Sequence, residues 1–175
     1  TLNFPVNYAA ANSTTPWYML GRLSGDTTFK LNVRSGWDGS AGGGDTGSGS
    51  IIQSDSSISY VLTNNHVIDA AATSGSIKIE MDNGDSYPAT IVGRDANYDL
   101  AVLKVNKGNL PTIQIGDSSS INIGDSVIAF GSPLGLSGTV TSGIVSSLNR
   151  PVTTGSSSTS SVNSYVNAIQ TDAAI

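Results

Sequence analysis

The sequence predicts an all-β protein built from many short strands. Hydrophobic residues make up only 38% of the chain and charged residues 12%. Much of the remainder is Gly, Ser, Thr and Asn, which favour turns and form helices poorly. Phe29, Leu31 and Val33 alternate with polar residues, as in a strand with one buried face. Asn83–Gly84 separates two strand-like runs, as in a tight β-hairpin whose turn needs positive φ angles.

Further apolar and alternating runs continue this pattern along the chain. The predicted strands are residues 51–52 and 59–62 as a hairpin, 77–81, 87–93 and 100–105, and later 113–115, 126–130 and 139–148. The Gly-rich residues 36–49 and the Ser/Thr-rich residues 153–164 are predicted to be surface loops. The earlier strands are enough for one small barrel, whereas the later ones supply about half of a second.

Three regions follow from this pattern. Residues 1–27 form an extension whose structure the sequence does not predict. Residues 28–112 are predicted to form the first barrel, and residues 113–175 the first part of the second.

Charge and composition exclude several classes of function. The net charge of −5 argues against a nucleic-acid partner, which requires clustered Lys and Arg. The chain has no cysteine, which excludes disulfides, thiolate zinc sites and a cysteine nucleophile. No apolar run is long enough to span a bilayer. The sequence predicts neither a metal site nor a cofactor.

His66 is the only histidine and is a candidate general base. It follows the strand predicted at 59–62 and precedes residues 69–72, which are predicted to form one helical turn. Imidazole titrates near neutral pH and therefore suits proton transfer. A lone histidine is more often structural, and a zinc role is weaker still because no second His or Cys completes a ligand set.

Asp99 directly precedes the apolar strand at 100–105. A buried carboxylate there requires a partner, and an imidazole N–H would satisfy it. The alternative is an aspartate that only caps the turn before the strand.

Several segments resemble the HtrA/DegP family of serine proteases. Thr63–Ile68 resembles the segment around that family's catalytic histidine, and Asp99–Val105 resembles the segment that carries its catalytic aspartate. Further matches in the same order are Gly47–Ile52, Gly124–Gly135, Thr139–Ser146 and Ile169–Ile175. The resemblance covers roughly residues 28–175.

The resemblance implies a chymotrypsin-like double β-barrel, with the first barrel complete and the second partial. It implies that His66 is the general base and that Asp99 orients it. In the family, a Gly-Asn-Ser-Gly-Gly stretch with the nucleophilic serine follows within a few residues of the segment that 169–175 resembles. The 175-residue chain alone is therefore expected to be inactive.

The resemblance also implies substrates and surroundings. Family members cleave unfolded or misfolded proteins outside the cytoplasmic membrane, and they have peptide activators and form homotrimers. Their loops order around the active site, so the two predicted loops are expected either to gate activity or to be plain flexible surface. The alternatives to an enzyme are a non-catalytic protease-like binding module and, from composition alone, a surface adhesin.

Overall fold

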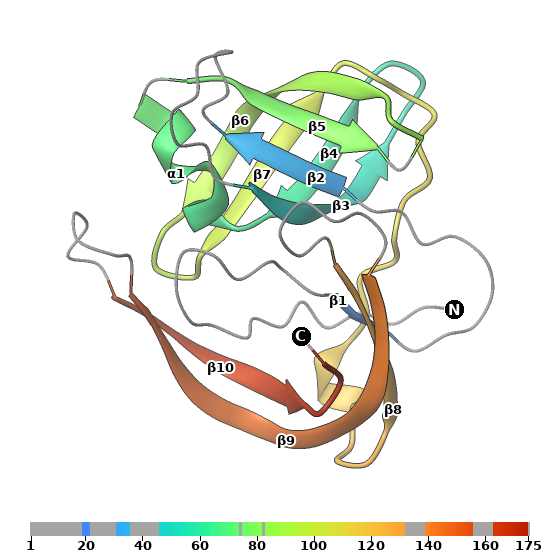
Figure 1. Ribbon diagram of the computed structural model, residues 1–175, viewed down its shortest axis with the longest axis vertical. Coiled ribbons are helices and arrows are strands. Elements are labelled where there is room, and N and C mark those ends of the chain that lie inside the picture. The colour runs from blue at the N-terminus through green and yellow to red at the C-terminus, as the bar shows by residue number, and fades with distance from the viewer. Residues whose placement is uncertain are drawn as a thin grey trace.

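Two β-sheet bodies form the described part of the chain, a closed barrel and an open sheet that lies below it in Figure 1. The computed structural model describes residues 19–21, 31–35, 46–73, 75–81, 83–131, 139–155 and 163–174. Within these residues the backbone is mostly strand, with one α-helix and one short 3₁₀ helix. The predicted all-β fold, with one complete and one partial barrel, is confirmed.

The first barrel closes through six antiparallel strands in the order β2-β3-β4-β7-β6-β5. These are β2 (Leu31–Ser35), β3 (Thr46–Ser54), β4 (Ser59–Thr63), β5 (Ile77–Met81), β6 (Ser86–Asp95) and β7 (Leu100–Val105). Pairing of β5 with β2 closes the ring, which leaves no free sheet edge in the barrel. The strands predicted at 51–52, 59–62, 77–81, 87–93 and 100–105 all lie in it.

Two tight turns set the register of the barrel hairpins. Between β3 and β4, Asp55 Oδ1 accepts hydrogen bonds from the backbone N–H of Ile58 at 2.8 Å and of Ser57 at 2.7 Å. These bonds stabilise the ionised carboxylate and lower the pKa of Asp55. Between β5 and β6, Gly84 takes φ = 85° and donates to the carbonyl of Met81 at 2.9 Å. Of the predicted Asn-Gly pair, only Gly84 has a positive φ.

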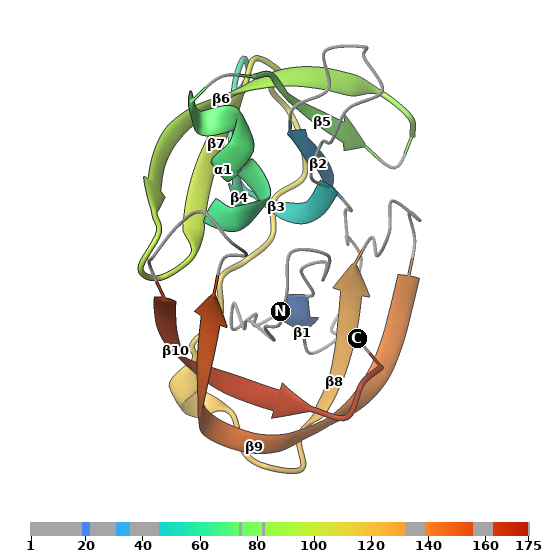
Figure 2. The same ribbon diagram turned by 60° about the vertical axis from the view of Figure 1, so that its left-hand side comes forward.

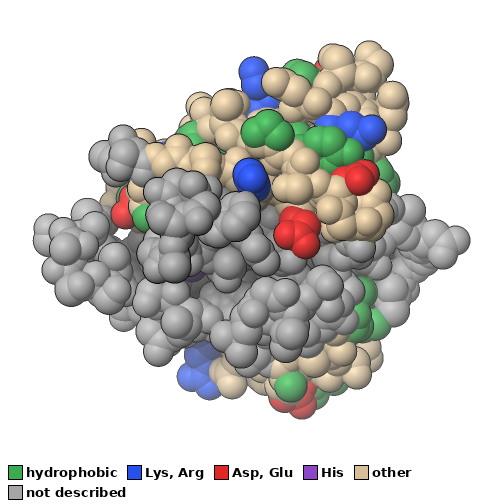
Figure 3. Space-filling model, turned by 45° about the horizontal axis from the view of Figure 1, so that its top comes forward, with side chains coloured by type: hydrophobic (Ala, Val, Ile, Leu, Met, Phe, Trp, Pro, Cys, Tyr) green, Lys and Arg blue, Asp and Glu red, His purple; other side chains and the backbone are tan. Residues whose placement is uncertain are grey.

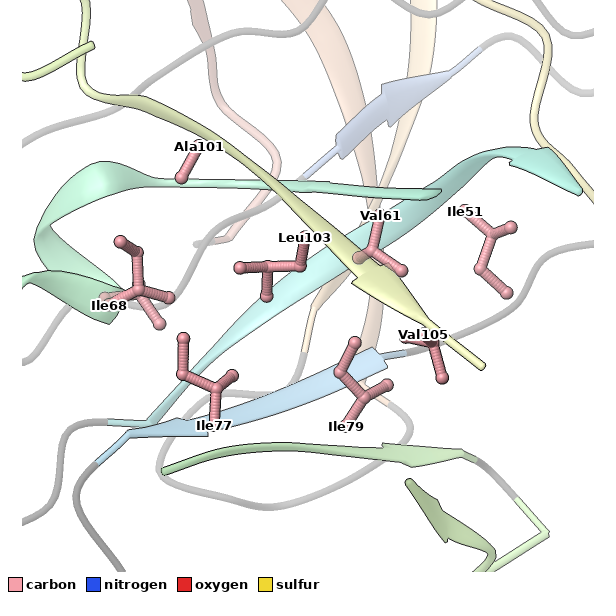
Figure 4. Packing of buried hydrophobic residues seen from close by; sticks show 9 residues of the cluster. Ile51, Val61, Ile68, Ile77, Ile79, Ala101, Leu103 and Val105 are labelled. Carbon is pink, nitrogen blue, oxygen red and sulfur yellow. The ribbon is translucent and has the colours of Figure 1, made fainter. Parts of the chain in front are cut away.

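The barrel core consists of alternate residues from each strand. In β7 the inward residues Ala101, Leu103 and Val105 are at most 1% exposed, while the residues between them are half-buried. Figure 4 shows these side chains meeting others from β3, β4, β5 and the helix; the full cluster is Ile51, Val61, Val67, Ile68, Ile77, Ile79, Ala101, Leu103 and Val105. Burying one such aliphatic side chain contributes about 1.5–3 kcal/mol, so this cluster is the main source of the barrel's stability.

The second body is a four-stranded antiparallel sheet in the order β1-β8-β9-β10. Its strands are β1 (Met19–Gly21), β8 (Ser126–Gly131), β9 (Thr139–Gly155) and β10 (Asn163–Thr171). Its core is smaller and centres on Ala129 and Val145, both fully buried. The long strand β9 is strongly curved in Figure 2. A register shift against β10 and a positive φ of 56° at Asn149 mark a bulge in this strand.

The segments joining and preceding the two bodies differ from the prediction. The extension 1–27, for which the sequence predicted no structure, contributes β1, which pairs with the edge of β8. Residues 113–115 do not form a strand, although Ile115 makes an isolated β-bridge. Instead, the N–H of Ile113 donates to the carbonyl of Ile51 at 2.8 Å, which ties this connection to β3 of the first barrel. A 3₁₀ turn, η1 (Ser118–Ser120), follows before β8.

Parts of both predicted loops are strand. Residues 46–49 of the Gly-rich stretch belong to β3, where Gly47 lets the helix approach: a Cβ there would lie 2.5 Å from Val67 Cγ2. In the Ser/Thr-rich stretch, Thr154 and Gly155 of β9 pair with Ser164 and Asn163 of β10, and Thr153 pairs with Tyr165 just beyond it. The other residues of both stretches lie outside the described residues. So do residues 132–135, the end of the segment Gly124–Gly135 that resembles the family.

Shortening Leu103 to alanine tests the importance of the barrel core. The fully buried side chain leaves a cavity when truncated, so Leu103→Ala is expected to lower the free energy of unfolding by about 2–5 kcal/mol. Val92→Ala, at a position 56% exposed on β6, should change it by less than about 1 kcal/mol. Urea denaturation measures both, and equal losses would contradict the assigned core.

Candidate active site

His66 lies in the first turn of α1 (Asn65–Thr73), directly after β4. The helix is longer than the predicted turn at 69–72 because it begins at Asn65. Val67 and Ile68 are 2% and 0% exposed and anchor the helix on the barrel core. The side chain of His66, 28% exposed, therefore projects away from that core and toward solvent.

Asp99 ends the turn between β6 and β7. Asp95 Oδ1 accepts hydrogen bonds from the backbone N–H groups of Asn97 and Tyr98, which closes the turn. Asp99 then takes φ = 54°, a left-handed conformation that aspartate tolerates better than most residues. Its side chain is 6% exposed and points inward. The alternative of a carboxylate that only caps the turn does not describe this geometry, because Asp95 performs the capping.

The structure brings His66 and Asp99 together. His66 Nδ1 lies 2.7 Å from Asp99 Oδ2, and the backbone N–H of His66 donates to Asp99 Oδ1 at 2.8 Å. A carboxylate can only accept, so the proton of the neutral imidazole resides on Nδ1 and the lone pair on Nε2. An imidazole held in this tautomer can take a proton at Nε2, and the adjacent carboxylate stabilises the imidazolium that results.

Asn64 is a third member of the site that the sequence reasoning missed. Its Nδ2 donates to Asp99 Oδ2 and to the Asp99 main-chain carbonyl, both at 2.9 Å. The residue is fully buried, and within the described structure its Oδ1 has no hydrogen-bond partner. Such an unpaired buried acceptor costs about 1–3 kcal/mol. The only signal in the sequence was an amide residue at the end of a strand, next to the candidate base.

An exposed ion pair connects the helix to β6. Arg94 Nη1 lies 2.5 Å from Asp69 Oδ1 and 3.3 Å from Asn65 Oδ1, on either side of His66. Both charged side chains are about two-fifths exposed, at 40% and 44%. Exposed pairs of this kind contribute little stability, about 0–1 kcal/mol. The pair therefore joins α1 to β6 without adding much stability.

The described residues contain no group of three or more His, Asp or Glu side chains arranged to hold a metal ion. The carboxylates of Asp85 and Asp95 accept hydrogen bonds within their own turns instead. Charged side chains of both signs are scattered over the described part of the face in Figure 3, where neither sign gathers into a patch. None of the described helices has the length and apolar character of a membrane span.

The residues after β10 pack tightly on β9. Asp172 Oδ1 accepts a hydrogen bond from the N–H of Ile144 at 2.8 Å, and Ala173 is 4% exposed. A Cβ on Gly143 would lie 2.4 Å from both Ala173 N and Asp172 Oδ1, so only glycine allows this approach.

Comparison with known proteins places these features in a family. Residues 47–175 match the trypsin-like peptidase domain family. The chain is 45% identical over 130 residues to the periplasmic serine endoprotease DegP of Salmonella typhimurium, covering 74% of this chain and 25% of that protein. It is 44% identical over 133 residues to the serine protease Do-like HtrA of Bacillus subtilis, covering 74% and 28%. The chain thus spans about a quarter of the length of these relatives.

Solved structures agree with this match. The HtrA-type protease AlgW with tripeptide superimposes with a TM-score of 0.64 at 36% sequence identity, covering 83% of this chain and 43% of that one. The resemblance to HtrA/DegP proteases and the chymotrypsin-like fold are therefore confirmed. The chain belongs to the trypsin-like peptidase domain family, with relatives among the HtrA and DegP serine proteases.

Proposed function

We propose that this chain is the part of a serine endopeptidase that carries the general base and its orienting carboxylate. The observation that carries the proposal is the 2.7 Å contact between His66 Nδ1 and Asp99 Oδ2. The order of the two residues along the chain, histidine before aspartate, is that of the chymotrypsin fold. The nucleophilic serine is proposed to come from sequence that follows residue 175.

In this mechanism His66 moves protons and Asp99 stays ionised. His66 Nε2 takes the proton of the serine hydroxyl as its oxygen attacks the carbonyl carbon of a peptide bond. The tetrahedral adduct then collapses, the C–N bond breaks, and His66 returns the proton to the leaving amine. Water attacks the acyl-enzyme in the same way and releases the new carboxyl end. Asp99 contributes by holding the tautomer and stabilising the imidazolium.

The packing of residues 172–174 supports the proposed position of the nucleophile. In HtrA-like sequences the corresponding segment leads into the stretch that holds the serine. Here the carboxylate of Asp172 and the absence of a side chain on Gly143 hold that segment against β9. The second sheet would thereby aim the chain toward the barrel that carries His66.

Substrate, location and assembly are proposed from the relatives. The names of the DegP relatives describe periplasmic endoproteases, so we propose an extracytoplasmic enzyme that cleaves unfolded or misfolded proteins. Activation by a peptide is likewise proposed, consistent with the AlgW structure solved with a tripeptide. A homotrimer is the proposed assembly, and sedimentation of the full-length protein tests it.

Substitution of the two site residues tests the function in the full-length protein. Both His66→Ala and Asp99→Asn are expected to lower kcat/KM on unfolded casein by about 10⁴-fold, since each removes the correctly held base. Asp85→Asn makes the same chemical change in the exposed β5–β6 turn and should leave the rate unchanged. Retention of activity by His66→Ala would overturn the assignment.

A serine-reactive fluorophosphonate distinguishes the enzyme from a non-catalytic protease-like module. The full-length protein is expected to form a covalent adduct at one serine beyond residue 175, because an activated hydroxyl attacks the phosphorus. His66→Ala should abolish labelling. Mass spectrometry locates the adduct, and an unlabelled wild-type protein would favour the binding module.

Gly143→Ala tests the contact between β9 and the residues after β10. The added Cβ would meet backbone atoms that cannot move independently, so the segment shifts and kcat is expected to fall by up to about 100-fold. Gly93→Ala, where nothing lies within 4 Å of the added Cβ, is the matched strand control. Equal activity of the two variants in the casein assay would refute the role of this contact.

A further inference from the structure

We propose that Asn64 is a positioning residue that acts through Asp99, an inference that rests on the proposed function of the His66–Asp99 pair. Its side-chain amide bridges two parts of one residue. One hydrogen bond runs to Asp99 Oδ2 and the other to the Asp99 main-chain carbonyl, both 2.9 Å long. The amide thereby ties the carboxylate to the backbone that bears it.

This bridge supports an unusual backbone conformation. Asp99 has a φ of 54°, which L residues adopt rarely. In that conformation its carbonyl and its carboxylate both face the buried end of β4, where Asn64 donates to each. Without the amide, the main-chain carbonyl would lose this bond, and of the described bonds the carboxylate would keep those from His66.

The unpaired oxygen of Asn64 indicates that the N–H groups are the reason for an amide at this position. Asn64 is fully buried, yet its Oδ1 has no hydrogen-bond partner within the described structure. An aliphatic side chain of similar shape would fill the same volume without an unpaired acceptor. If the residue served packing alone, leucine would serve better.

The shared oxygen explains how Asn64 would influence the reaction. Both Asn64 Nδ2 and His66 Nδ1 approach Asp99 Oδ2, and the His66 N–H occupies Oδ1. The amide therefore limits rotation of the carboxylate and keeps Oδ2 directed at the imidazole. Loss of this restraint would misalign the base while leaving the substrate-binding surface unchanged.

Two variants test the proposal by steady-state kinetics on the full-length protein. In Asn64→Ala and Asn64→Leu, kcat on a peptide substrate is expected to fall by about 10- to 100-fold, with KM within about twofold of wild type. Asn64→Leu fills the volume and guards against loss of folding in Asn64→Ala, which circular dichroism checks. Full activity of a folded Asn64→Leu would overturn the proposal, because it would show that shape alone suffices.

Asn65→Ala is the matched control. Asn65 is the neighbouring asparagine and is also buried, but its Oδ1 accepts from Arg94 and its side chain has no bond to Asp99 among those described. The Asn65→Ala variant should keep kcat close to the wild-type value. A kcat loss as large as that of Asn64→Leu would show that any change at this junction disturbs the site, and would contradict a specific role.

Nitrogen and proton NMR of His66 measures the effect of Asn64 on the imidazole independently of catalysis. The 175-residue chain has a single histidine, so its imidazole signals are unambiguous. In a longer form of the protein, the imidazole signals that disappear in His66→Ala are those of His66. The Nδ1-bound proton is expected to exchange with water about tenfold faster in Asn64→Leu. Unchanged exchange would refute the positioning role. Faster exchange in a protein whose His66→Ala variant still cleaves casein would refute the proposed function alone.

Discussion

The buried carboxylate of Asp99 is the constraint on which the arrangement of the site depends. A charged group that is almost withdrawn from water must find hydrogen-bond donors. All of those described come from one short stretch, the junction of β4 and α1, through Asn64 Nδ2 and the N–H and Nδ1 of His66. Burial of the charge therefore links the β6–β7 turn to the start of the helix and determines where the imidazole lies.

The barrel keeps the two partners of this contact, the β4–α1 junction and the β6–β7 turn, in fixed positions. β4 and β7 are adjacent strands in register, and Thr63 at the end of one pairs with Ala101 near the start of the other. Leu103 and Ile68 bury the strand and the helix in the same core. The two halves of the site thus extend from neighbouring ends of a single packed unit, and little motion between them is available.

How much the sequence predicted depends on how local each feature is. The alternation of residues 77–81 indicates one buried face, so β5 was predicted with its correct bounds. Residues 113–115 show the same alternation, but they form no strand, and Ile113 makes a single backbone hydrogen bond to Ile51 of β3. The alternation alone does not reveal which residues a segment will pair with. The short strand β1 exists through its pairing with β8, which no local pattern reveals. The resemblance indicated His66 and Asp99, whereas the donors on Asn64 became visible only once β4 and the β6–β7 turn were brought together.

The pairing of β1 with β8 has a consequence for the order of folding. The first described strand of the chain hydrogen-bonds to a strand that follows the entire barrel, so Met19 meets Phe130 across more than one hundred intervening residues. Closing so long a loop is entropically unfavourable unless the enclosed chain is already compact. During synthesis β1 can therefore pair with β8 only after the whole barrel sequence between them has been made.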